Sequence, residues 1–68
     1  MENKFKENLK LLRQELGLTQ KQLAEKIGVS KGMISFWENG IHEPTLSNLI
    51  RLAILFHVSI DYLAGLED

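Results

Sequence analysis

The chain has 68 residues, no cysteine and a formal net charge of −1 at pH 7. That length suits one small domain, and the absence of cysteine excludes disulfide bonds and thiolate metal sites. Hydrophobic residues make up 44% of the sequence, too many for a disordered chain. No apolar run approaches the ~20 residues needed to span a membrane. We therefore expect residues 1–68 to form a single folded domain in the cytoplasm, with no membrane as a partner.

Basic residues are unevenly distributed along the chain. Seven of the eight lie within the first 31 positions, and Arg51 is the only one after Gly40. The charged residues of the second half are otherwise acidic. This polarity favours a basic half that meets phosphate, but solvated surface charges explain it equally well.

The first predicted helix has an apolar side chain every three or four residues, at Phe5, Leu9, Leu12 and Leu16. Gly17 ends this helix, and Leu18 packs back on it. Thr19 then begins a second helix as its N-cap, and Gln22 completes a Thr-x-x-Gln capping box. The buried face of the second helix comprises Leu23, Ala24 and Ile27.

A three-residue turn, Gly28-Val29-Ser30, joins the second and third helices. Gly28 is expected to take a left-handed conformation that other residues adopt only at a steric cost. Ser30 is a preferred N-cap, so the third helix starts at Lys31 and runs to about Asn39. Two short helices joined in this way have the geometry of a DNA-reading helix-turn-helix. Its expected core consists of Leu23, Ala24, Gly28, Ile34 and Trp37.

Two further helices follow a loop at residues 41–44. The fourth is capped by Thr45, and its expected buried stripe is Leu46, Leu49, Ile50, Ala53 and Phe56. Further apolar residues widen this stripe nearly all round, as in a helix that is central or shared with a partner. We expect Val58 to end this helix. The last short helix is capped by Ser59 and closes the bundle with Ile60, Leu63 and Leu66. The sequence thus predicts an all-α fold of five helices.

One side of the third helix carries Gly32, Ser35, Phe36 and Asn39, with Lys31 at its leading edge. Small, polar or basic side chains on a short helix suit base readout in the major groove. We therefore predict base contacts by Lys31, Gly32, Ser35 and Phe36. Lys31 can donate to guanine, and Phe36 can pack on a thymine methyl group. Packing of Phe36 against the following loop, near Ile41 and Pro44, is an equally good alternative.

Phosphate contacts are expected near the helix starts and at the end of the third helix. Gln20 lies in the first turn of the second helix, where its amide and free backbone N–H groups can bind a phosphate oxygen. The full expected set is Thr19, Gln20, Ser30, Asn39 and His42. A solvated loop position is the alternative for His42. The second histidine, His57, is interpreted as a packed or half-exposed side chain rather than a ligand.

Two charged residues, Arg13 and Glu38, each follow an apolar residue of a predicted helix. If the first and third helices both pack on the second, these charges meet as a partly buried ion pair. Two unrelated surface charges are an equally good interpretation of their positions.

The chain resembles the phage-repressor helix-turn-helix family (lambda-repressor-like, Cro/CI or XRE) over roughly residues 5–66. The resemblance rests on Leu16-Gly17-Leu18-Thr19-Gln20-x-x-Leu23-Ala24, Gly28-Val29-Ser30, Ile34-Ser35-x-Trp37-Glu38-Asn39-Gly40, Pro44-Thr45-x-x-Asn48-Leu49 and Val58-Ser59-x-Asp61-Tyr62-Leu63. It implies operator binding as a homodimer with the third helix in the major groove. It also implies phosphate contacts by Gln20 and Asn39 and pairing of Arg13 with Glu38. Family members usually carry longer polar side chains at Gly32 and Phe36, so hydrogen-bonded readout is expected to be sparse here.

We predict a sequence-specific transcriptional regulator, a repressor that binds an inverted repeat in double-stranded DNA as a homodimer, because one short helix reads too few base pairs. The expected dimer contact is Leu52, Leu55, Leu63 and Leu66. The alternative is a protein-interaction module of the same fold, antitoxin-like or an adaptor, with weak DNA binding. No motif of an enzyme is present, so no cofactor, metal or small-molecule ligand is expected.

Overall fold

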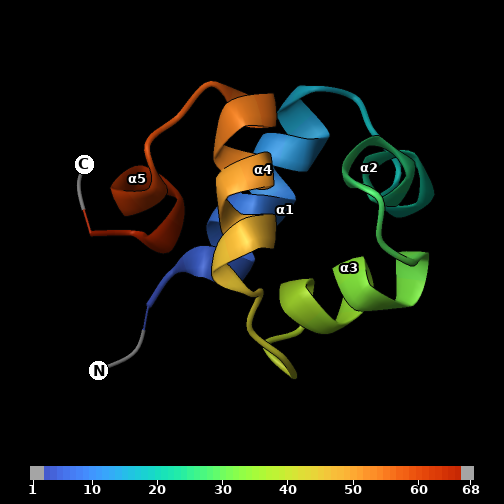
Figure 1. Cartoon of the computed structure of the whole chain (residues 1–68), viewed down its shortest axis with the longest axis horizontal. Coiled ribbons are helices and arrows are strands. Elements are labelled where there is room, and N and C mark those ends of the chain that lie inside the picture. Colours follow the sequence, from blue (N-terminus) through green and yellow to red (C-terminus); the bar gives the residue numbers. More distant parts are fainter. Residues whose placement is uncertain (1–2, 67–68) are drawn as a thin grey trace.

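The computed structural model describes residues 3–66, which form helices joined by short loops (Figure 1). In chain order these are α1 (Phe5–Glu15), α2 (Gln20–Ile27), α3 (Lys31–Glu38), α4 (Leu46–Phe56) and α5 (Ile60–Ala64). No strand occurs within the described residues. The predicted all-α fold of five helices is therefore confirmed for this part of the chain.

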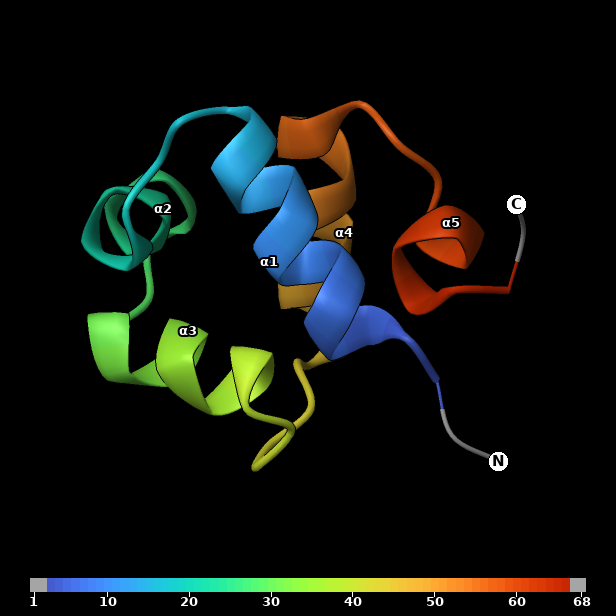
Figure 2. The same cartoon turned by 180° about the vertical axis from the view of Figure 1, so that it is seen from behind.

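The helices are arranged around α1 and α4. In the view along the shortest axis, α4 lies in front of α1, with α2 and α3 on one side and α5 on the other (Figures 1 and 2). α3 packs against both α2 and α1, while α5 packs against α1 and α4. As a result α3 lies at the edge of the molecule, and none of the other helices drawn covers its outer side.

A single core draws buried apolar side chains from all five helices, namely Phe5, Leu9, Leu12, Leu23, Ala24, Ile27, Ile34, Trp37, Leu52, Phe56 and Leu63. Trp37 is the largest of the fully buried ones, and its ring meets that of Phe5 edge-on with the centroids 6.4 Å apart. Full burial of one large apolar side chain contributes about 1.5–3 kcal/mol. Ile34 and Trp37 therefore fix the inner side of α3, and with it the direction in which the outer side faces.

Four helices begin at the N-caps that the sequence predicted. The hydroxyl oxygens of Thr19, Ser30, Thr45 and Ser59 each accept a hydrogen bond from a backbone N–H three residues later. The capping box is confirmed as well, because the Gln22 side chain accepts from the backbone N–H of Thr19 at 2.8 Å. At the start of α1 the Asn3 side chain accepts from the Phe5 N–H at 3.0 Å. These bonds satisfy donors that a helix start otherwise leaves unpaired.

The end of α4 differs from the prediction. The helix stops at Phe56, and His57 follows in a left-handed conformation with φ of +56°. His57 is exposed, so its interpretation as a packed or half-exposed side chain was wrong. The Val58 N–H then donates to the Ala53 carbonyl at 3.1 Å and closes the helix end. The prediction that Val58 ends the helix was wrong because the usual signal, a glycine, is absent at this position.

Four predicted core positions are exposed instead. Leu16 follows the end of α1 and lies outside its apolar stripe, Leu46 is on the outer side of α4, and Leu66 follows α5. In α4 the buried side is formed by Leu52, Ala53 and Phe56, so Ile50 is exposed too. The predicted stripe is confirmed at Ala53 and Phe56, which are buried, and at Leu49, which packs against the core. It missed Leu52 because most residues of this helix are apolar and the pattern does not fix the edges of the buried side. Leu52 and Leu63 are 0% exposed, so the expected dimer contact through these two residues is wrong.

Candidate nucleic-acid interface

The turn between α2 and α3 has the predicted backbone. Gly28 is left-handed, with φ of +78°, and the N–H groups of Gly28 and Val29 both donate to the Ala24 carbonyl, at 2.9 and 3.0 Å. Gly28 itself is exposed, so it acts through its backbone and not as part of the packed core. The other four expected core residues of this motif, Leu23, Ala24, Ile34 and Trp37, are buried. The chain therefore changes direction within three residues while the two helices remain packed together.

The outer side of α3 presents the residues expected to read bases. Lys31, Gly32 and Phe36 are exposed, whereas Ser35 is half-buried. A Cβ atom added at Gly32 would meet only the Ser30 hydroxyl oxygen, at 3.8 Å. This side of the helix is therefore uncovered around its first turn, where Lys31 is also exposed.

Asn39 and Ser35 are linked at the end of α3. The Asn39 amide donates to the Ser35 carbonyl at 2.9 Å and approaches the Ser35 hydroxyl at 3.3 Å. One expected phosphate contact and one expected base contact are thus joined, and the amide is turned back toward the helix. Asn39 is nevertheless exposed and lies beside the outer side of α3.

The ring of Phe36 lies against that of His42. The two centroids are 5.1 Å apart with the ring planes at 75°, an edge-to-face arrangement. The Phe36 side chain is 41% exposed, so the loop partly supports its ring but leaves much of it accessible. From the sequence, Phe36 either contacts a base or packs against the loop. In the structure its ring contacts the loop and also remains partly exposed. Sequence reasoning did not anticipate the contact with His42, because spacing within a loop carries no periodic signal.

The structure brings Arg13 and Glu38 together across α1 and α3. Arg13 Nε lies 2.6 Å from Glu38 Oε2, and Nη2 donates to Oε1 at 3.0 Å, while Nη1 donates to the Leu18 carbonyl at 2.8 Å. The side chains are only 12% and 4% exposed. The hydrogen bond to Glu38 raises the pKa of Arg13 above its ordinary value; burial opposes this shift, and the negative charge of Glu38 adds to it. Arg13 therefore remains charged wherever the domain is folded.

Gln20 belongs to the same cluster. Its half-buried amide donates to Glu38 Oε1 at 3.1 Å, so the ion pair sets its orientation at the start of α2. The hydroxyls of Thr19 and Ser30, two other expected phosphate contacts, act as N-caps and are exposed. Hydrogen bonds within the chain thus fix the first turns of α2 and α3. The bond from Gln20 to Glu38 was not indicated by the spacing of residues in the sequence.

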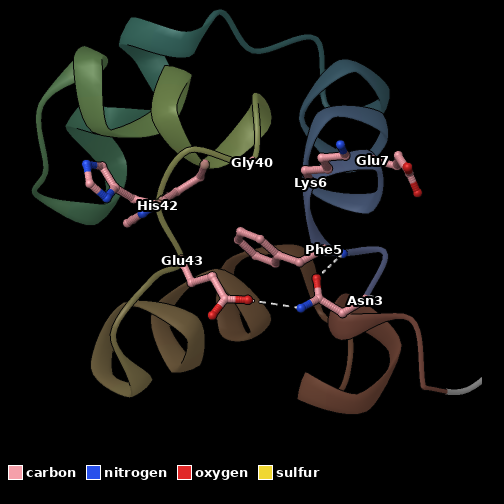
Figure 3. Close-up of a pocket in the computed structure, with 8 residues that line it drawn as sticks. Asn3, Phe5, Lys6, Glu7, Gly40, His42 and Glu43 are labelled. Atoms are coloured by element: carbon pink, nitrogen blue, oxygen red, sulfur yellow. Dashed lines mark hydrogen bonds between the residues drawn. The ribbon is translucent and has the colours of Figure 1, made fainter. Parts of the chain in front are cut away.

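A shallow pocket of about 280 Å³ lies between the start of α1 and the loop after α3 (Figure 3). The Asn3 amide spans it by donating to Glu43 Oε2 at 3.1 Å while its carbonyl oxygen accepts from the Phe5 N–H. These bonds attach the loop to α1. Within residues 3–66 no group of three or more His, Cys, Asp or Glu side chains is placed to hold a metal ion. In the same part of the chain no helix has the length and apolar character to cross a membrane.

Comparison with known proteins identifies similar chains. The helix-turn-helix YobD regulator of Bacillus subtilis (strain 168) is 44% identical over 62 residues, which are 91% of this chain and 55% of that protein. A transcriptional regulator from Listeria innocua has a similar structure, with a TM-score of 0.92 at 38% identity over 100% of this chain and 64% of that one. The P22 c2 repressor protein, solved with a synthetic operator, gives 0.87 at 33% identity over 93% of this chain and 96% of that one.

The chain spans about half the length of the curated relatives it matches. The helix-turn-helix family matches residues 9–63, which include the turn, the outer side of α3 and the Arg13–Glu38 pair. The chain therefore belongs to the helix-turn-helix family, in its phage-repressor-like (XRE, Cro/CI) group.

Proposed function

We propose that this chain is the DNA-binding domain of a transcriptional repressor and that α3 enters the major groove of its operator. The observation that carries the proposal is the two-sided character of α3: Ile34 and Trp37 fix its inner side in the core, and Lys31 and Phe36 are exposed on its outer side. An α-helix with its side chains is about 10–12 Å across, which fits the major-groove width of about 12 Å. The operator complex of the similar P22 c2 repressor supports this assignment.

Base and phosphate contacts are divided between two surfaces in this proposal. Lys31, Gly32, Ser35 and Phe36 face base edges. Thr19, Gln20, Ser30 and Asn39 contact the phosphate backbone at the helix starts and at the end of α3. The division is supported by Gln20, whose amide is oriented by Glu38 at the N-terminus of α2, where backbone N–H groups and the helix dipole favour a phosphate. Phosphate contacts of this kind position the domain without selecting a sequence.

The repressor acts as a homodimer on an inverted repeat in this proposal. Two recognition helices related by a two-fold axis must lie about 34 Å apart to enter successive major grooves. The longest extent of the domain is 27 Å, so two copies in direct contact can span that distance. An apolar stripe on α4, formed by Leu46, Ile50 and Ile54, is exposed and available for the contact. In this proposal the α4 stripe replaces the dimer contact that was expected from the sequence.

Selection of bound duplexes from a random pool tests the proposed function. The expected product is an inverted repeat with half-sites about 10 bp apart, centre to centre. Affinity should fall steeply with salt, because phosphate neutralisation releases counterions. If no duplex is enriched and binding is negligible at low salt, the alternative of a protein-interaction module replaces the proposal.

The dimer is tested with a matched pair of variants. Ile54→Glu places a charge in the α4 stripe, and Leu11→Glu places one on an exposed leucine of α1. Sedimentation on the selected duplex should give two copies per duplex for the parent protein and for Leu11→Glu. Ile54→Glu should give one copy per duplex at the same concentration. If the parent protein itself sediments as a 1:1 complex, the homodimer is excluded. If Ile54→Glu still sediments with two copies, the dimer uses another surface.

A further inference from the structure

We infer that His42 is a positioning residue that holds the ring of Phe36 in place for contact with a thymine methyl group. This inference rests on the proposed function, because it assigns a role within the same α3 surface. The direct observation is the edge-to-face contact of the two rings, with centroids 5.1 Å apart. The sequence had suggested only a phosphate contact or a solvated position for His42.

The backbone before His42 is anchored to Phe36 itself. The Ile41 N–H donates to the Phe36 carbonyl at 2.9 Å, and the Gly40 N–H donates to the Trp37 carbonyl at 3.2 Å. Gly40 has φ of +72°, the left-handed conformation that this helix ending requires. The loop is therefore folded back over the last turn of α3, next to the residue whose ring it contacts.

The residue after His42 makes a second contact, through its side chain. The carboxylate of Glu43 accepts a hydrogen bond from the Asn3 amide at 3.1 Å, and this bond attaches the loop to the start of α1. In Figure 3 the imidazole of His42 lies on the side of the loop away from Lys6 and Glu7. Backbone bonds hold the loop before His42, and the Glu43 side chain holds it after His42, so the His42 ring stays next to Phe36.

A positioned phenylalanine reads a methyl group better than a free one. A Phe36 ring without support loses rotamer freedom when it docks in the groove, and that entropy cost reduces the gain from the apolar contact. The contact with His42 restricts the ring before DNA binds, while 41% of the side chain stays exposed for the methyl group. His42 thereby contributes to specificity for thymine without touching a base.

The ring contact is tested first in the free protein by NMR. The ring protons of His42 should carry a ring-current shift that disappears in Phe36→Ala. His57 is the matched control, because it is also exposed but lies at the end of α4, and its ring protons should not respond. Unchanged His42 ring protons in Phe36→Ala would overturn the inference whatever the DNA result.

The consequence for readout is tested on the selected duplex, with each thymine replaced in turn by uracil, which lacks the methyl group. At one position the parent protein should bind uracil about fourfold more weakly than thymine, the effect expected for burying one methyl group. Phe36→Ala should abolish this difference, and His42→Ala should reduce it to less than twofold. His42→Phe should preserve the fourfold difference, because it keeps an aromatic ring but cannot hydrogen-bond to phosphate.

Two results would overturn the inference while leaving the proposed function intact. In the first, His42→Ala and His42→Phe weaken thymine and uracil duplexes equally, as expected for a phosphate contact. In the second, the parent protein binds an enriched operator but shows no uracil effect at any position. Failure to enrich any operator would instead reject the proposed function, and the NMR result would still report whether the two rings are in contact.

Discussion

Arg13 and Glu38 form a bidentate ion pair that links α1 to α3. Both hydrogen bonds, at 2.6 and 3.0 Å, lie within a region where the two side chains are 12% and 4% exposed. The same carboxylate accepts from Gln20 at 3.1 Å, so a single acidic residue links three helices. The position of α3 at the edge of the molecule therefore depends on this carboxylate as well as on the core.

Removal of Glu38 should destabilise the domain strongly. Glu38→Ala leaves the Arg13 charge buried without its partner, and we expect a loss of about 3–5 kcal/mol in the free energy of unfolding. That is a large share of the roughly 3–10 kcal/mol available to a domain of this size. Urea unfolding measures the change. The control is Glu25→Ala, on the exposed side of α2, which should stay within about 0.5 kcal/mol of the parent. A loss below about 1 kcal/mol for Glu38→Ala would mean that the pair behaves as a surface one.

Replacement of His57 by glycine should stabilise the domain. A residue with a side chain loses about 1–2 kcal/mol of stability in a left-handed conformation. Glycine avoids this strain, but its greater freedom in the unfolded chain offsets part of the gain. His57→Gly should therefore raise the free energy of unfolding by about 0.5–1 kcal/mol. The converse control is Gly28→Ala, at φ of +78° with open space around the added Cβ atom, which should lower it. Equal thermal melting of His57→Gly and the parent would contradict the assigned conformation.

Gly32→Ala should separate stability from DNA binding. Gly32 is the second residue of α3, so alanine there should gain part of the roughly 1 kcal/mol by which it is favoured over glycine in a helix interior, and an added Cβ atom has room. We expect higher thermal stability together with altered affinity for duplexes that differ at one base pair. If stability rises and the ranking of duplexes does not change, Gly32 does not face the bases.

Lys31→Ala should affect one position of the operator. Loss of its donor to guanine should cost about 1–3 kcal/mol at a single guanine-containing base pair and relax the preference there. Competition binding with duplexes substituted one base pair at a time measures this. A uniform loss on all duplexes would instead assign Lys31 to the phosphate backbone.

Gln20→Ala should weaken binding to all duplexes to a similar degree and leave the preferred sequence unchanged, because a phosphate contact carries no sequence information. Its amide also bonds Glu38, so unfolding is measured on the same sample. Selection of bound duplexes with the variant checks the prediction. Enrichment of a different sequence would show that Gln20 contributes to base readout.

Local signals in the sequence predicted most of the architecture. The N-caps at Thr19, Ser30, Thr45 and Ser59 and the glycine turn at Gly28 all lie where the sequence placed them, because a cap or turn depends on a few neighbouring residues. The two faces of α3 were also predictable. When polar and apolar residues lie on opposite sides of a helix, the apolar side packs on the core and the polar side faces solvent.

Tertiary structure decided what such signals do not encode. The phase of α4 was ambiguous because the helix is apolar nearly all round, and packing buried Leu52 while leaving Leu46 and Ile54 exposed. The pairing of Arg13 with Glu38 and the ring contact of Phe36 with His42 join separate elements, so they depend on how α1, α3 and the following loop pack in space. Local patterning thus determined the helices and the side of α3 that faces solvent. Only packing between elements determined which charges are paired and which ring supports Phe36.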